Sequence, residues 1–156
     1  MKRKVINVLL TALPVIATGL LGSFFMMIAK IDYESLATPL FAPKGIVFPI
    51  AWSILYLLII ISGYLFLKDK VDKEMKIKGM IVYYIGLIFN AFWTFFFFTL
   101  DLKVFSIIWL VLLYIVSASN YVIFFKKSKI SGYLLIPYLV WLLFAMYLNI
   151  GIAILN

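Results

Sequence analysis

Five long apolar runs, separated by short polar stretches, dominate the pattern of the chain. They cover roughly residues 5–29, 45–67, 79–100, 104–125 and 131–155. Each has about 21–25 residues, and at a rise of about 1.5 Å per residue a helix of this length crosses a hydrocarbon core about 30 Å thick. The runs are too long for strands and do not alternate. The pattern predicts an all-α fold: an integral membrane bundle of five transmembrane helices, one domain over residues 1–156.

The first run follows Lys2, Arg3 and Lys4, as the core of a signal peptide would. However, its apolar stretch is about twice the usual length of a signal core, and no small-x-small cleavage site follows. We therefore expect a retained helix. Pro14 lies at mid-span in this run and predicts a kink, unless a neighbouring group bonds to the carbonyl that the proline frees.

Composition identifies lipid as the solvent of this fold. Hydrophobic residues make up 67% of the chain and charged residues 13%, so a soluble domain of 156 residues could not bury the apolar surface. There is no cysteine and no histidine, which excludes disulfides, thiol chemistry, histidine metal sites and imidazole catalysis. All six acidic residues fall in connectors or at span ends, which disfavours a proton- or sodium-coupled transporter.

Basic residues are distributed unevenly over the connectors. The N-terminus and the connectors at 68–78 and 126–130 share one side of a five-helix bundle, and this side holds eleven of the 14 basic and three of the six acidic residues. The positive-inside bias then predicts a bacterial-type cytoplasmic membrane protein with its N-terminus inside and its C-terminus outside. We therefore interpret the excess positive charge as a topology signal that also attracts membrane lipid weakly. We expect no nucleic-acid partner.

The connector at residues 30–44 is the longest and predicts a lid. Pro39 and Pro43 fix φ and remove backbone donors, so they should stiffen this loop. Pro49 is tolerated in the first turn of the following run. Because Trp52 comes one turn later, the loop should lie over an aromatic helix face, as a lid over a pocket.

Three runs carry stripes of aromatic and small polar residues at helical spacing. These stripes are Trp52 and Tyr56; Asn90, Trp93, Thr94 and Phe97; and Tyr138, Trp141, Ala145 and Asn149. Such faces suit a flat aromatic ligand, because they combine stacking surfaces with a few hydrogen-bond donors. Interfacial aromatic belts and ordinary bundle packing explain the same residues, and the stripes alone leave both interpretations open.

Three ordered blocks resemble the translocator protein family, also called the TspO/MBR, tryptophan-rich sensory protein or peripheral benzodiazepine receptor family. The first block is PLFAPKGIVFPIAWSILY, the second NAFWTFFFF and the third LLIPYLVWLLFAMYLNIGIAILN, at residues 39–56, 90–98 and 134–156. The chain departs from the family pattern in its loop, where Lys44 replaces a second proline and Phe41 and Ile46 replace tryptophans. We expect a looser cap for this reason.

The resemblance implies a five-helix protein, often a homodimer, with a porphyrin pocket capped by its first loop. Together with the stripes it implies these ligand-binding residues: Tyr33, Pro43, Trp52, Tyr56, Asn90, Trp93, Thr94, Phe97, Trp141 and Ala145. Trp52 and Asn90 would donate hydrogen bonds, the other two tryptophans would stack, and Ala145 would leave room. Lys30 and Lys44 would attract propionates at the mouth. Gly79 and Gly86 fit either a dimer seam or packing within one chain.

The resulting functional prediction is a receptor or sensor that binds protoporphyrin-type tetrapyrroles, or a similar hydrophobic small molecule, and regulates their level. One alternative is a light-dependent enzyme that degrades porphyrin and uses Trp52 and Trp141 as catalytic residues; another is a carrier of porphyrin or lipid. We expect no cofactor and no metal. A metal-free porphyrin is the expected guest, because the chain has no histidine or cysteine to hold haem iron. No basic residue follows Tyr147, so the chain lacks the short cholesterol-type pattern.

Overall fold

The computed structural model describes residues 2–70 and 72–156, and these residues form helices and connecting loops without a strand. The elements are α1 (Lys2–Met27), a 3-10 turn η1 (Tyr33–Ser35), α2 (Val47–Lys68), α3 (Lys73–Thr94), a π-helical turn η2 (Phe95–Thr99), α4 (Lys103–Lys127), α5 (Lys129–Tyr133) and α6 (Ile136–Leu155). Five helical segments are long and apolar enough to cross a membrane, with α3 and η2 forming the third and α5 and α6 the fifth. The predicted all-α, five-helix membrane bundle is therefore confirmed.

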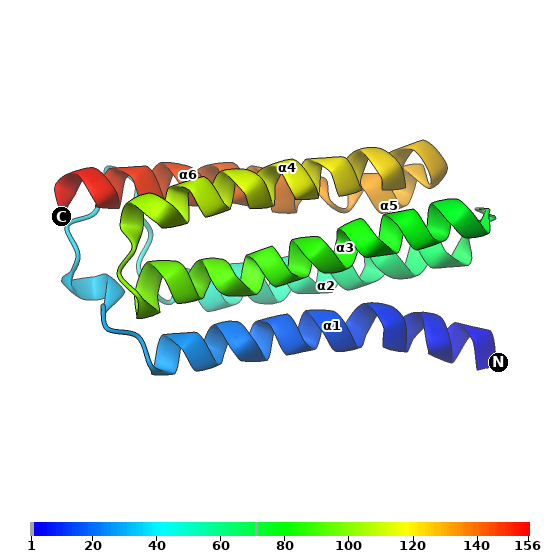
Figure 1. Ribbon diagram of the computed structural model, residues 1–156, viewed down its shortest axis with the longest axis horizontal. Coiled ribbons are helices and arrows are strands. Elements are labelled where there is room, and N and C mark those ends of the chain that lie inside the picture. Colours follow the sequence, from blue (N-terminus) through cyan, green and yellow to red (C-terminus); the bar gives the residue numbers. More distant parts are fainter. Residues whose placement is uncertain (1, 71) are drawn as a thin grey trace.

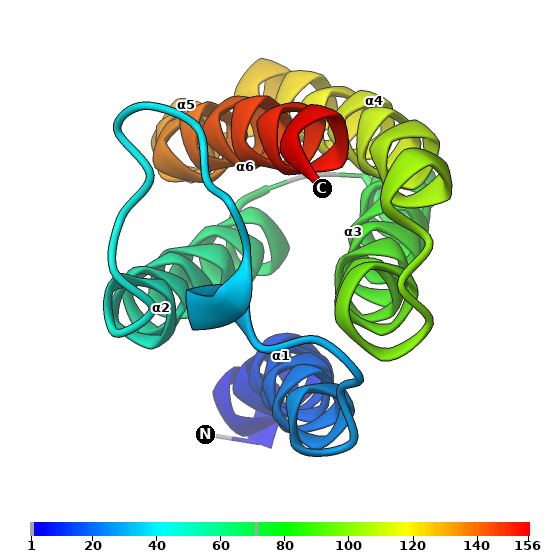
Figure 2. The ribbon, with the colours of Figure 1, turned by 90° about the vertical axis from the view of Figure 1, so that its left-hand side faces the viewer.

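The long helices lie side by side along one axis, with the two ends of the chain at opposite ends of the bundle (Figure 1). Viewed along that axis, α1, α2, α6, α4 and α3 follow one another around the bundle (Figure 2). The connector between α1 and α2 crosses the end that also holds the C-terminus (Figure 2). We call this connector, residues 28–46, the lid, and this end of the bundle the lid end.

Helix α1 continues through Pro14 because a neighbouring helix bonds to the carbonyl that the proline leaves free. Proline has no N–H, so the carbonyl of Leu10, four residues earlier, loses its partner within the helix. The Tyr84 hydroxyl of α3 donates to this carbonyl oxygen at 3.0 Å. Tyr83 donates to the carbonyl of Thr11 at 3.2 Å. These bonds join α1 to α3 at membrane depth, where an unpaired carbonyl would be costly.

Helix α3 begins six residues before the predicted apolar run, because Asp72 caps it. The Asp72 carboxylate accepts a hydrogen bond from the Met75 N–H at 2.8 Å. This bond, with a smaller contribution from Lys127, holds the pKa of Asp72 below its ordinary value. The first turn is polar, so hydrophobicity alone placed the start of the helix too late.

The last membrane segment is interrupted at residues 134–135, between α5 and α6. Pro137 lies in the first turn of α6 and cannot donate to the carbonyl of Tyr133, which explains the break. At α5, Gly132 permits a very close approach to α4: a Cβ added there would lie 2.7 Å from the Phe125 Cα.

Small residues on α3 serve packing within the chain. A Cβ at Gly79 would lie 2.7 Å from the Phe66 ring of α2, and one at Gly86 would contact Val116 of α4 at 3.7 Å. Phe66 stacks on Phe124 with ring centroids 4.0 Å apart, and both are fully buried. Of the two interpretations of these glycines, the structure therefore shows the intramolecular one.

Candidate functional site

A large cavity lies between α1 and α2 at the lid end. Its volume is about 790 Å³, within the range of about 300–1,000 Å³ typical of small-molecule sites. Residues of α1, the lid, α2 and the end of α3 line it: Ile16, Gly19, Leu20, Gly22, Ser23, Met26, Met27, Asp32, Tyr33, Glu34, Gly45, Phe48, Pro49, Trp52, Ser53, Tyr56, Trp93 and Phe98. Leu20 and Met27 are 66% and 83% exposed, so the cavity opens at the side of the bundle, where lipid would lie.

Glycines of α1 make room for the aromatic wall on α2. A Cβ added at Gly19 would lie 3.3 Å from the Tyr56 ring, which is tighter than ordinary packing. Trp52 lies one turn nearer the lid on the same face, with its ring centroid 5.3 Å from that of Tyr56. The two rings therefore form one continuous aromatic surface beneath the lid.

Four of the predicted ligand-binding residues line this cavity: Tyr33, Trp52, Tyr56 and Trp93. Trp141 does not line it but lies behind the aromatic wall, with its ring centroid 6.3 Å from that of Trp52 at 81°. Phe48 extends this contact toward the lid, 6.1 Å from Trp141 and 4.9 Å from Tyr33. A chain of aromatic contacts thus connects the lid, α2 and α6.

Asn90 also lies behind the wall, where both ends of its amide are bonded. Its Oδ1 accepts from the Tyr56 hydroxyl at 2.9 Å, and its Nδ2 donates to the Tyr138 hydroxyl oxygen at 3.2 Å. The side chain is 3% exposed. Asn90 therefore joins α2, α3 and α6, and it fixes the phenol that lines the cavity.

Trp93 reaches the floor of the cavity while its indole N–H points to α6. The N–H donates to Asn149 Oδ1 at 3.1 Å, and the same oxygen accepts from the Ser106 hydroxyl at 3.0 Å. Asn149 Nδ2 donates to the Lys103 carbonyl at 3.1 Å. The indole ring is thus held in place by α4 and α6, with one edge left for the cavity.

The remaining predicted residues surround the cavity without lining it. Phe97 and Ala145 border a void of about 20 Å³ below Tyr33, too small for an aromatic guest. Thr94 faces α1, where a Cβ at Gly22 would lie 3.9 Å from its hydroxyl oxygen. Pro43 contributes its carbonyl, which accepts from the Tyr33 hydroxyl at 2.9 Å.

Sequence reasoning missed several parts of the lining, namely the lid carboxylates Asp32 and Glu34, the α1 face and Phe98. The α1 face has residues typical of a lipid-facing helix, such as Leu20 and Met26, so no stripe distinguishes it. Phe98 lies in η2, and the wider π-helical turn that directs it carries no recognisable sequence signal. The carbonyl of Phe98 accepts from the Lys30 N–H at 3.0 Å, so this turn also holds the start of the lid.

The lid is bonded to itself above the cavity. Tyr33, 8% exposed, binds the Pro43 carbonyl, and Glu34 Oε1 accepts from the Gly45 N–H at 2.9 Å. Burial, with a smaller effect of the adjacent Glu34 carboxylate, raises the pKa of Tyr33 above its ordinary value. These bonds hold the two ends of the lid close together.

Helix α6 holds the far side of the lid. The Asn156 amide exchanges two hydrogen bonds with the backbone of Ala37, at 3.0 and 2.9 Å. The Tyr147 hydroxyl donates to the Leu40 carbonyl at 2.6 Å. Pro39 packs on Gly151, where an added Cβ would lie 2.6 Å from the proline ring.

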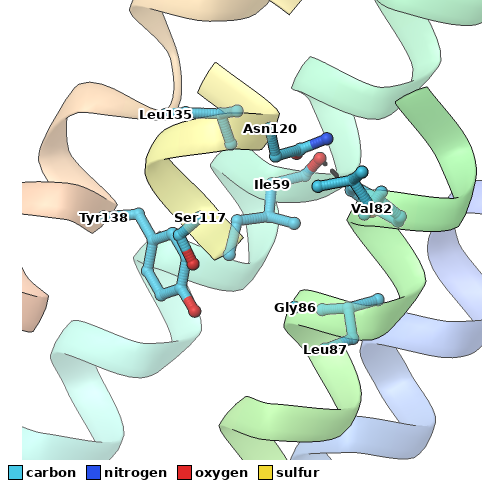
Figure 3. Close-up of a pocket in the computed structure, with 9 residues that line it drawn as sticks. Ile59, Val82, Gly86, Leu87, Ser117, Asn120, Leu135 and Tyr138 are labelled. Carbon is cyan, nitrogen blue, oxygen red and sulfur yellow. Dashed lines mark hydrogen bonds between the residues drawn. The ribbon is translucent and has the colours of Figure 1, made fainter. Parts of the chain in front are cut away.

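A second, much smaller void lies among α2, α3, α4 and α6 (Figure 3). Its volume is about 20 Å³, room for about one water molecule. Ser117 is 5% exposed, and its hydroxyl oxygen bonds to no group among the described residues. Figure 3 shows its side chain next to that of Tyr138. The void is part of the core and is too small for a ligand that would fill the main cavity.

Comparison with known proteins gives the family. The family model described as TspO/MBR family matches residues 10–155. The chain is 32% identical over 153 residues to the tryptophan-rich protein TspO of Archaeoglobus fulgidus, covering 97% of this chain and 98% of that protein. It is 32% identical over 124 residues to protein CrtK of Rhodobacter capsulatus, covering 80% of this chain and 78% of that protein. It is 28% identical over 124 residues to the tryptophan-rich sensory protein of Cereibacter sphaeroides, covering 80% of this chain and 76% of that protein. The chain forms a five-helix membrane bundle with an aromatic cavity beneath its first loop. Together with these relatives, the family match shows that it belongs to the TspO/MBR family.

Proposed function

We propose that this protein is a membrane receptor that senses porphyrins of the protoporphyrin type by binding them between α1 and α2. The cavity of about 790 Å³ carries this proposal, because it is the size of a ligand site and its wall is aromatic. Trp52 and Tyr56 offer ring faces for stacking, and Trp93 and Phe98 offer the floor. A flat, largely apolar ring system matches such a surface.

The arrangement also supports binding from the membrane. The side opening between α1 and α2 lies at membrane depth, so an apolar guest would reach it through lipid. By the charge asymmetry of the connectors, the N-terminus is cytoplasmic and the lid end faces outward. A regulator of tetrapyrrole level would then sample porphyrin on the outer side of the bilayer.

Quenching of tryptophan fluorescence by protoporphyrin IX tests the proposal. The protein has four tryptophans, two of which line the cavity. Trp52→Ala should weaken binding about fivefold or more, since a lost stacking surface costs about 1–3 kcal/mol. Trp109→Phe is the matched control: this indole stacks on Phe89 with centroids 4.3 Å apart and lines no described cavity, so affinity should not change. Equal affinities of the wild type and Trp52→Ala would refute the site.

A pair of indoles favours a second candidate function, light-driven degradation of the porphyrin with dioxygen as oxidant. Trp52 lies on the cavity wall and Trp141 directly behind it, and neither indole N–H is bonded to a described residue. Under illumination in air, this function requires repeated turnover, seen as loss of the Soret band, that Trp141→Phe abolishes. A complex that keeps its Soret band indicates a receptor only.

A further inference from the structure

The charged side chains that line the cavity are both acidic. Asp32 and Glu34 face it from the lid, and no lysine or arginine is among the lining residues. The two lysines expected to receive propionates, Lys30 and Lys44, do not line the cavity, although all four of these charged side chains are exposed. The mouth therefore presents carboxylates to a guest, although the lid as a whole carries as many lysines as acidic residues.

Hydrogen bonds to the backbone hold these carboxylates in place. Glu34 Oε1 accepts from the Gly45 N–H at 2.9 Å, and Asp32 Oδ1 accepts from the Glu34 N–H at 3.3 Å. The described residues include no cation within 4.0 Å of either carboxylate; the ion pairs that they form are Lys103 with Asp101 and Lys127 with Asp72. Both charges are thus held at the mouth by backbone hydrogen bonds, and neither is paired with a cation of the described residues.

We infer that the cavity selects, among flat aromatic guests, those whose polar end at the lid is neutral or cationic, and that Asp32 and Glu34 determine this specificity. The inference rests on the proposed function, since it concerns the periphery of a guest whose ring lies against Trp52 and Tyr56. A carboxylate on the guest would lie near two charges of its own sign, which raises the cost of binding. An amine would gain a charge-assisted hydrogen bond there.

This charge selection bears on which natural tetrapyrroles the cavity would bind. Free propionates at the lid would be repelled, whereas esterified or amidated side chains would not. The preferred guest is then a ring system whose carboxylates are masked, or one that directs them away from the lid toward the side opening. The same cavity would accept a flat aromatic amine.

Three derivatives of one ring system test the inference: protoporphyrin IX, its dimethyl ester, and its bis-amide carrying two tertiary amines. They share the ring and differ in charge at the periphery. Affinity is measured by tryptophan quenching in nanodiscs of zwitterionic lipid, with protein-free nanodiscs subtracted to correct for partition into lipid. We expect the diamine to bind best, the ester next and the dicarboxylate most weakly, with smaller differences at high ionic strength.

The variants Glu34→Gln and Asp32→Asn remove charge while keeping an acceptor oxygen for the Gly45 and Glu34 N–H groups. Each should improve binding of the dicarboxylate and weaken binding of the diamine, by about two- to fivefold, as expected for exposed charges. Binding of the ester should stay constant. Lys44→Gln is the matched control, because it removes a charge of the same loop that does not line the cavity.

The outcomes separate the two proposals. If the dicarboxylate binds more tightly than the ester, or if the double variant leaves the order unchanged, the charge selection is overturned while porphyrin binding stands. If Lys44→Gln specifically weakens the dicarboxylate, the lysines select the guest and the inference is wrong. If none of the three compounds quenches the wild type beyond protein-free nanodiscs, the proposed function fails, and the inference fails with it.

Discussion

The amide of Asn90 holds the aromatic wall of the cavity to the rest of the bundle, and its replacement by leucine tests this role. Leucine fills a similar volume but removes two interhelical bonds, from Tyr56 at 2.9 Å and to Tyr138 at 3.2 Å. In a membrane each such bond contributes about 0.6 kcal/mol on average and about 1.7 kcal/mol at most. Asn90→Leu should therefore lower the free energy of unfolding by about 1–3 kcal/mol.

Unfolding in mixed micelles of increasing SDS content, followed by tryptophan fluorescence, measures this difference. A double-mutant cycle with Tyr56→Phe isolates one bond, and its coupling energy should be about 0.6 kcal/mol. The cycle with Tyr138→Phe measures the other bond in the same way. An Asn90→Leu variant as stable as the wild type, or a coupling energy of zero in both cycles, would show that the amide does not hold the wall.

Three further predictions concern the core and the lid. Ser117→Ala should leave stability unchanged or raise it by about 1 kcal/mol in the same assay, because the buried hydroxyl oxygen bonds to no described residue. Ser62→Ala, which loses the bonds of the Ser62 hydroxyl to the Ser131 carbonyl and hydroxyl, should lower stability, and equal losses in both variants would contradict this. Gly151→Val should displace Pro39 and lower stability by about 1–3 kcal/mol. Porphyrin should also be released faster in stopped-flow measurements, and an unchanged release rate would mean that the lid does not rest on α6. Because the pKa of Tyr33 is raised, the Tyr33 hydroxyl keeps its proton in the folded protein at a pH where the unfolded chain has lost it. In thermal unfolding, the stability advantage of the wild type over Tyr33→Phe should therefore be constant below about pH 10 and shrink above it. A stability advantage that grows at high pH would contradict this sign.

The length of the apolar runs was sufficient to predict the five membrane helices, because lipid leaves few alternatives for the backbone. The start of α3 was missed, since a polar turn capped by Asp72 does not add to hydrophobicity. The interruption before α6 was signalled by Pro137, but its consequence for the helix was not predicted. Helix ends thus depend on caps and single backbone donors, which a hydrophobic average does not represent.

The candidate site was predicted in part for a different reason. The periodic stripes predicted side chains that face the interior, and three of these, Trp52, Tyr56 and Trp93, line the cavity. Whether an interior residue faces a cavity or another helix depends on how the helices are rotated against each other. Asn90 and Trp93 show this: one is fully bonded behind the wall and the other lies on the floor. The α1 wall has the composition of any lipid-facing surface, so only the three-dimensional arrangement reveals it.

If the cavity binds a guest as proposed, the side opening between α1 and α2 makes the bilayer the reservoir from which that guest is drawn. A dissociation constant expressed in aqueous concentration then includes the free energy of partition into lipid, about 0.8 kcal/mol for each added methylene group. Two porphyrins that make identical contacts with Trp52 would differ in apparent affinity solely through their alkyl substituents. Affinities of this protein are therefore comparable between guests only as mole fractions in the membrane, and the lipid-to-protein ratio becomes part of the binding equilibrium.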